Sequence, residues 1–396
     1  MEKRARLTRA IADEAWPCAV VDLDAFERNV KRIVAIATAH GKKLRIATKS
    51  IRVPELVRRI HAAAPGIGLM TYTARETAYL HEQGYDDLLL AYPTARRADA
   101  DLVARTARSA EVSMVVDDVA HLEVLDAAAR DAGVAVDVIV EVDIAFRPLD
   151  RVHLGVRRSP LRETADVLAF VDRIATFGSL RFRGIMGYEA QIAGLGDDMP
   201  GGVAARLTSV AVRALKSRSR VQVERMRHDI VTALRDRGTP PAIVNGGGTG
   251  NLTWCAAEPV LTEVTAGSGF LGSHLFDRYR EVRPEPAVYF ALQVVRAPAK
   301  GIVTCFGGGY VASGEAGGDR LPIPSLPEGL TLLAREGAGE VQTPLRLAPG
   351  LELAIGEPVF FRHAKTGELA EHFAEYLLVR GDRIESRALT YRGLGR

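Results

Sequence analysis

Between about residue 44 and residue 275, short runs rich in apolar and β-branched residues alternate with segments that carry a helical pattern. This alternation is typical of strand-helix units that build a parallel sheet. Eight runs qualify as strands: LRIATKS (44–50), GIGLMTYT (66–73), DLLLAY (87–92), EVSMVVDD (111–118), VDVIVEVD (136–143), LRFRGIMGYE (180–189), AIVNGGGT (242–249) and LTEVTAGS (261–268). Eight such units predict a (β/α)8 barrel, with an open doubly wound sheet as the alternative.

The pattern changes from about residue 280 onward. Stretches such as VYFALQVV and HFAEYLLVRGDRIESRALTYRG have strand-like runs broken by Gly and Pro, with little helix. We therefore expect a barrel over residues 25–278 and a β-domain over residues 279–396, to which residues 1–24 contribute.

The composition argues against several kinds of partner. Lys and Arg number 52 against 49 Asp and Glu, so nothing demands nucleic acid or an acidic membrane, and a small anionic ligand suffices. No apolar run approaches the roughly 20 residues of a membrane helix, and the N-terminal stretch lacks the apolar segment of a secretory signal. The cysteines, Cys18, Cys255 and Cys305, are widely spaced and odd in number, which favours a reducing compartment. We expect a cytoplasmic protein.

Two single residues stand at the ends of predicted strands, where the chemistry of a barrel lies. Lys49 ends the first strand after an apolar run, as suits a lysine that forms a Schiff base, although a solvated lysine gives the same pattern. Tyr188 ends the sixth strand, where it either lines a cofactor site or packs in the core.

Two glycine-containing turns follow the last two predicted strands. The run Asn245–Asn251 (NGGGTGN) follows the seventh, and Thr265–Gly269 (TAGSG) ends the eighth. Glycines let backbone N–H groups converge on a phosphate, with the Thr249 hydroxyl as a further donor. Loops after strands seven and eight are the usual phosphate site of such barrels. The alternatives are turns that serve packing only, or a dinucleotide site, for which the spacing is not G-x-G-x-x-G.

In their order along the chain, these elements resemble the fold-type III enzymes of the alanine racemase type, which use pyridoxal 5'-phosphate (PLP). The resemblance rests on PCAVVDLD (17–24), Lys49, the GGGTGN loop, EVTAGSGFLGSHLFDRY, and a C-terminal domain with HAK (363–365). It is greatest for the D-threonine aldolase and D-serine dehydratase group. The resemblance implies a homodimer and a small amino acid as substrate.

The resemblance also implies roles for individual residues. Lys49 would be the Schiff-base lysine, and Tyr188 would lie near the cofactor ring or the substrate. The phosphate and the rest of the cofactor would be held by Asn245, Gly247, Gly248, Thr249, Gly267 and Ser268.

This sequence departs from the resembled group at the position that faces the pyridine nitrogen. Racemase-like members have an Arg there in a short R-x-G motif after the fifth strand. The matching stretch begins at His153, with Arg147 and Arg151 just before it. Arg147 and His153 are therefore the candidates to contact the ring.

A second departure concerns a metal. The resembled aldolases and eukaryotic-type dehydratases hold a divalent cation with His-x-Asp or His-x-Cys, whereas this sequence has His363 and Lys365. An ammonium group has no lone pair for a metal. We expect the Lys365 ammonium to supply a fixed positive charge at the position where relatives hold the cation. A metal bound by His363 together with Glu368 or His372 stays an alternative.

The resemblance leaves three reactions and one non-catalytic role open. If His363 takes a proton from a β-hydroxyl, a D-configured β-hydroxy amino acid undergoes retro-aldol cleavage, which we expect first. If Lys49 takes the Cα proton while Lys365 assists hydroxide, the result is β-elimination with loss of ammonia. A racemase would need a second base, for which Tyr310 is the candidate. A non-catalytic PLP carrier would have no need of the β-domain.

Overall fold

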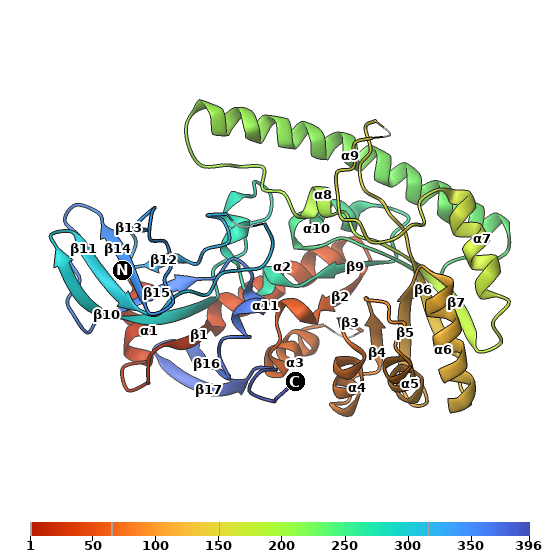
Figure 1. Cartoon of the computed structure of the whole chain (residues 1–396), viewed down its shortest axis with the longest axis horizontal. Helices are drawn as coiled ribbons and strands as arrows, with labels where there is room; N and C mark the ends of the chain where they lie inside the picture. The colour runs from red at the N-terminus through yellow and green to blue at the C-terminus, as the bar shows by residue number, and fades with distance from the viewer. Residues whose placement is uncertain (1, 65, 150, 316) are drawn as a thin grey trace. The chain divides into compact units, whose positions relative to one another are not determined.

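The computed structural model describes residues 2–64, 66–149, 151–315 and 317–396 (Figure 1). The chain forms two compact units. One comprises Val34–Lys49 and Ala64–Gly267, and the other comprises Met1–Ile33, Ser50–Ala63 and Ser268–Arg396. Each unit is built from separated stretches of chain, so this division does not test single domain limits. The limits expected at residues 24 and 278 stay a prediction.

The first unit contains a closed barrel of eight strands. They are β2 (Lys43–Ala47), β3 (Gly68–Thr71), β4 (Asp87–Leu90), β5 (Glu111–Val116), β6 (Val136–Glu141), β7 (Leu180–Gly187), β8 (Ile243–Gly246) and β9 (Glu263–Ala266). All neighbouring pairs are parallel, and β2 closes the ring against β9 with Lys43 opposite Glu263. The predicted (β/α)8 barrel is confirmed, and the open doubly wound sheet is wrong.

Helical segments follow the barrel strands in the chain, as the alternating pattern predicts (Figure 1). They are η1 (Thr48–Ser50) and α3 (Pro54–Ala62), α4 (Ala74–Glu82), α5 (Arg97–Thr106), α6 (Val119–Ala132), α7 (Thr164–Ile174), α8 (Ala190–Ala193) and α9 (Val203–Asp236), η2 (Thr249–Asn251) and α10 (Leu252–Ala257), then η3 (Ser268–Phe270) and η4 (His274–Arg278). Local chemistry fixes several ends. Asp118 caps α6 by accepting from the Ala120 N–H, and α6 stops at Gly133, whose φ is 68°.

The barrel interior contains a buried ionic cluster. Arg45 on β2 is fully buried and donates to Glu263 at 2.7 Å and to Asp87 at 3.1 Å. The Asn245 amide joins the cluster by donating to Glu263 at 2.8 Å and to Thr265 at 3.0 Å. The Asn245 amide therefore has partners within this cluster, and its expected use as a cofactor contact stays a prediction.

The second unit contains a mixed sheet in the order β13-β14-β11-β10-β1-β16-β17, with β15 joining β10 to β12. Its strands are β1 (Cys18–Asp22), β10 (Val288–Ala299), β11 (Ile302–Phe306), β12 (Ile323–Leu326), β13 (Leu330–Leu332), β14 (Gln342–Leu347), β15 (Pro358–Arg362), β16 (Glu375–Arg380) and β17 (Arg383–Leu389), with helices α1 (Glu2–Ala10) and α11 (Thr366–Leu369). Helix α2 (Leu23–Ala39) follows β1. The N-terminal β1 pairs with β10 and β16, more than 250 residues later in the chain.

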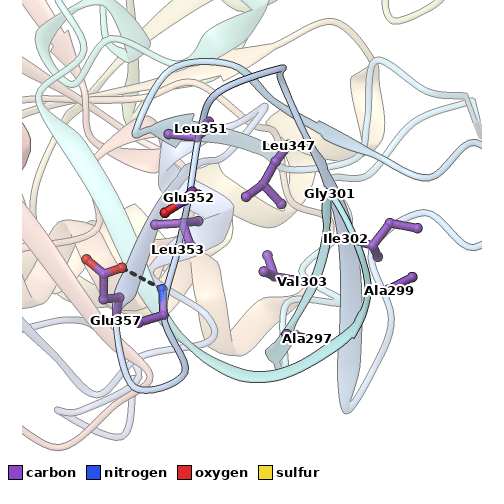
Figure 2. A pocket seen from close by; sticks show the side chains of 11 residues that line it. Ala297, Ala299, Gly301, Ile302, Val303, Leu347, Leu351, Glu352, Leu353 and Glu357 are labelled. Atoms are coloured by element: carbon purple, nitrogen blue, oxygen red, sulfur yellow. Dashed lines mark hydrogen bonds between the residues drawn. The ribbon is translucent and has the colours of Figure 1, made fainter.

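A cavity of about 470 Å³ lies in this second unit (Figure 2). Aliphatic side chains of β10, β11 and the loop 351–357 line most of it. Its two carboxylates are Glu352 and Glu357, and Glu357 pairs with Arg4 at 2.8 Å and accepts a hydrogen bond from the Ala354 N–H at 2.7 Å. Since no predicted site residue lines it, this cavity takes no part in the candidate site.

Two further predictions concern the whole chain. Among the residues that the structure describes, no helix is long and apolar enough to cross a bilayer. Cys18, Cys255 and Cys305 are buried free thiols. Burial raises the pKa of Cys255 to about 12, so this thiol stays protonated and packs as an apolar group.

Candidate functional site at the carboxyl ends of the barrel strands

Lys49 lies in the single turn η1, directly after β2. The strand ends at Ala47, two residues earlier, because Thr48 leaves the ladder and its hydroxyl donates to the Met70 carbonyl at 3.0 Å. The Lys49 ammonium donates to the Tyr92 hydroxyl at 2.5 Å and lies 5.2 Å from the centre of that ring. Tyr92 follows β4, so the mouth of the barrel brings together two strand ends that are 43 residues apart.

An arginine that the sequence analysis did not single out lies at this mouth. The Arg158 guanidinium carbon lies 5.9 Å from the centre of the Tyr92 ring and 5.2 Å from that of Tyr188, within the range of cation–π attraction. Its Nη1 lies 3.7 Å from Oε1 of Glu141, the last residue of β6. Lys49, Tyr92, Arg158 and Tyr188 are thus linked side by side.

The two residues proposed from sequence to face a pyridine nitrogen have other contacts. Arg147 pairs with Asp143 at 2.5 Å, and His153 contacts the Val156 carbonyl through Nε2 at 3.2 Å. These partners are Asp143 and Val156 and not the rings of Tyr92 and Tyr188. Arg158, five residues after His153, is the cation that the structure brings to these rings.

Glu141 is the most perturbed acid of the mouth. Its side chain is only 6% exposed, and burial raises its pKa to about 7, with Asp117 and Asp143 adding to the shift and Arg158 opposing it. A carboxyl that titrates near neutral pH beside a cation is a common feature of functional sites. The sequence signal for it was weak, because Glu141 is one of two acids in an otherwise apolar strand.

The two glycine turns lie next to each other. The Gly267 N–H donates to the Thr249 hydroxyl at 3.4 Å, which joins the turn after β9 to the turn after β8. The Tyr188 ring packs on Gly248, where an added Cβ would lie 3.1 Å from Tyr188 Cε2. Burial raises the pKa of the Tyr188 phenol, so it remains a hydrogen-bond donor at neutral pH.

The glycine loop does not present its first N–H groups to a ligand. The Gly247 N–H donates to the Glu189 carboxylate at 2.9 Å, and the Gly248 N–H donates to the Asn251 side chain at 2.8 Å. Glycine is required here for backbone conformation and close packing, because Gly247 has a φ of 90°. In this structure the two N–H groups thus have protein acceptors, and their convergence on a phosphate, with the Thr249 hydroxyl, stays a prediction.

Glu189 holds the loop after β8 in place by accepting hydrogen bonds from it. Its buried carboxylate pairs with Arg227 and also accepts from the Asn251 side chain at 3.0 Å. Arg227 in turn pairs with Glu258 at 2.6 Å. The loop after β8 is thus fixed by a buried ionic network rather than by the glycines alone, and the sequence analysis missed Glu189 although it is next to Tyr188.

The remaining predicted residues belong to the second unit. Ser268 begins η3. His363 follows β15, and its ring is buried, with Nδ1 2.6 Å from the Lys365 carbonyl. The Lys365 N–H also lies 3.0 Å from Nδ1, so this nitrogen faces both an acceptor and a donor, whereas Nε2 has no hydrogen-bond partner among the described residues. Burial lowers the pKa of His363, against backbone contacts of Lys365 and Tyr310, so the imidazole is neutral at pH 7.

Lys365 is held by its own neighbours. Its ammonium donates to the Ser313 hydroxyl at 2.8 Å and pairs with Glu368 at 3.3 Å. Glu368 also accepts from the Ser313 hydroxyl at 2.5 Å. In the described part of the chain, no three His, Cys, Asp or Glu side chains gather as a metal site would require.

Tyr310, the candidate second base of a racemase, packs in an aromatic cluster. Its ring lies 4.6 Å from His372, 5.0 Å from Phe290 and 5.4 Å from Phe373, measured between ring centres. Burial raises the pKa of the Tyr310 phenol, so it stays protonated at neutral pH.

The donor set at the barrel mouth is the kind that PLP requires. A primary amine, a packed tyrosine ring, a guanidinium group and two adjoining glycine turns lie on the carboxyl ends of parallel strands. Glycine at position 248 keeps the space beside Tyr188 free of a Cβ. The residues present therefore fit a planar, phosphorylated aldehyde.

An eight-stranded barrel with a separate β-domain, and a lysine after its first strand, defines a recognised class of protein. Residues 21–274 match the family of the alanine racemase N-terminal domain, and the chain belongs to this family. The protein is similar to 3-hydroxy-D-aspartate aldolase of Paracoccus denitrificans (strain Pd 1222), with 26% identity over 254 residues, and to D-threonine aldolase of an Arthrobacter species, with 27% identity over 254 residues. These matches cover 64% of this chain but only 59% and 60% of the two relatives.

Solved structures extend the likeness to nearly the whole chain. D-threonine aldolase from Filomicrobium marinum matches with a TM-score of 0.82 and 21% identity, over 97% of each chain. D-threo-3-hydroxyaspartate dehydratase from Delftia sp. HT23 matches with a TM-score of 0.74 and 22% identity, over 96% of this chain and 98% of the other. These likenesses establish the shared fold, including the β-domain.

Proposed function

We propose that this protein is a PLP-dependent lyase that cleaves a D-configured β-hydroxy amino acid in a retro-aldol reaction. The observation that carries the proposal is the Lys49 ammonium, held by the Tyr92 hydroxyl at the barrel mouth beside Arg158 and Tyr188. Membership of the family and the names of its relatives, aldolases of D-threonine and 3-hydroxy-D-aspartate, support the reaction class.

Lys49 would hold PLP covalently, Tyr188 would pack against it, and Thr249 with Gly267 would contact its phosphate. When bound, PLP withdraws electron density from the substrate Cα, so that a bond to Cα can break. Tyr92 holds the Lys49 amine in place through its hydroxyl. Arg158 supplies a fixed positive charge at the mouth, which suits the carboxylate of an amino acid.

In the second unit, His363 would take the proton of the substrate β-hydroxyl on Nε2. The neutral ring and its buried Nε2, which has no hydrogen-bond partner among the described residues, suit this role. A second reaction is β-elimination with loss of ammonia. It is favoured by the presence of the Lys365 ammonium, which would assist a leaving hydroxide. The D-threo-3-hydroxyaspartate dehydratase of Delftia sp. (strain HT23), 27% identical over 252 residues, supports this alternative.

We further propose a cytoplasmic homodimer that acts on a small amino acid.

Substitution of Lys49 by alanine is expected to remove covalent attachment of PLP. Wild-type protein mixed with PLP should show a near-visible absorbance band that borohydride abolishes while it fixes the cofactor to the chain. Mass spectrometry of the reduced protein should place the adduct on Lys49. Lys42→Ala, which changes a lysine bound to the Glu258 and Leu261 carbonyls, serves as the control and should keep the band. An adduct on another lysine would contradict the proposal that Lys49 binds PLP covalently.

Chelation is expected to leave activity on D-threonine within about twofold, because the Lys365 ammonium has no lone pair to offer a metal. Lys365→Asp places a carboxylate ligand two residues from the His363 imidazole, so this variant should become dependent on added Mn²⁺. Activity is measured after dialysis against chelator, with and without the metal. Loss of wild-type activity on chelation, with recovery on addition of Mn²⁺, would contradict the prediction.

A further inference from the structure

Arg52 has an unusual backbone conformation three residues after Lys49. Among the described residues other than glycine, it is the one with a positive φ, 55°. An L-residue in this left-handed region is strained by about 1 kcal/mol or more. Such conformations persist when the surroundings hold the chain in place, and they concentrate at functional sites.

Several contacts within the second unit hold this segment. The Arg52 guanidinium pairs with Glu371, and its side chain is only 19% exposed. The Arg52 carbonyl accepts from the Tyr391 N–H at 2.9 Å. Two residues earlier, the Ser50 carbonyl accepts from the Thr366 hydroxyl at 3.2 Å. Ile51 between them is fully buried.

These contacts bear on Lys49 through the chain itself. Lys49 and Ser50 belong to the same short turn, η1, so a shift of the Ser50 carbonyl moves the Lys49 backbone. The anchoring residue Thr366 begins α11 directly after Lys365, and Glu371 lies two residues after this helix ends at Leu369. The segment after Lys49 is therefore fastened to the part of the chain that carries Lys365 and His372.

We propose that Arg52 is a positioning residue, whose ion pair with Glu371 fixes the turn that presents the Lys49 amine. This inference rests on the proposed function for the role of Lys49. A purely structural role for Arg52 would affect the stability of the second unit without a specific effect on the reactivity of Lys49. The two roles are separated by measuring PLP attachment and amide exchange together with stability.

The test uses Arg52→Glu, Glu371→Arg and the double variant in the full-length protein. Each single variant should bind PLP about tenfold more weakly and should exchange the amide hydrogens of residues 49–52 faster, because like charges now face each other. The double variant restores an ion pair and should recover both properties. Arg52→Asn, which tolerates the left-handed conformation but lacks the charge, covers the case in which a charge reversal prevents folding.

The outcomes separate this inference from the proposed function. If the wild-type protein forms no borohydride-reducible adduct at Lys49, both fail together. If it does, while the single variants bind PLP as tightly as wild type, only the positioning role of Arg52 is overturned. It is also overturned if the double variant remains as weak as the single ones, or if PLP affinity falls only in proportion to a lowered melting temperature.

Discussion

Replacement of Glu189 by alanine is expected to destabilise the barrel unit by about 3–5 kcal/mol, the usual cost of removing one partner from a buried ion pair. Arg227 would keep its pair with Glu258 but lose the Glu189 carboxylate, and the Gly247 N–H and the Asn251 amide would lose their acceptor. Glu189→Gln keeps an acceptor without the charge, so its cost should be intermediate.

Urea unfolding followed by Trp254 fluorescence, in a Trp16→Phe background, measures this effect in the barrel unit. Trp254 lies in α10, directly after the glycine loop. Glu111→Gln is the matched control, because Glu111 forms an exposed pair with Arg183 and should cost less than about 1 kcal/mol. A Glu189→Ala variant as stable as this control would show that the buried network does not hold the loop.

Substitution of Glu141 by glutamine is expected to stabilise the protein at pH 8 relative to pH 4.5, by about 3 kcal/mol. Burial raises the pKa of Glu141 from 4.5 to about 7, so the folded protein keeps a proton that the unfolded chain has already released. Below pH 4.5 both states are protonated and the shift costs nothing. As the pH rises from 4.5 to 7, the wild-type protein loses stability, and the loss is complete above pH 7. Glutamine carries no such titration.

The measurement compares the free energy of unfolding of both proteins by urea at pH 4.5, 6 and 8. The difference between variant and wild type should grow with pH over this window. Glu163→Gln, which changes a carboxylate that is 76% exposed, provides the control for removal of a charge. A difference between Glu141→Gln and wild type that does not vary with pH would mean that the carboxyl is ionised throughout, held by Arg158.

Local pattern was sufficient to predict the barrel. Each strand carries its own apolar run, and some of the following helices have clear start and stop signals, such as Asp118 and Gly133 around α6. Lys49, Tyr188 and the two glycine turns were found for the same reason, since each lies at the end of a run that is visible in the sequence. The structure differs mainly in ending those strands earlier, as β2 does at Ala47.

The sequence did not predict which side chains from distant parts of the chain lie next to each other. Tyr92 and Arg158 become neighbours of Lys49 and Tyr188 only when the ring of strands closes, and no spacing along the chain encodes that approach. For the same reason the sequence did not reveal that the Gly247 N–H donates to Glu189, at another strand end, or that the Asn245 amide donates to Glu263. Arg147 and His153 were proposed from a short motif, which cannot show where a loop folds back.

The pairing of β1 has a consequence for synthesis on the ribosome. The strand Cys18–Asp22 is buried along its whole length, yet its partners are Val288–Ala291 and Tyr376–Val379. An emerging chain exposes this apolar strand with open edges until the last third has been made, and contacts of such sequence separation form slowly. The nascent protein therefore needs protection from aggregation for most of its translation. A truncated message would release a chain whose first strand lacks the strands that it pairs with.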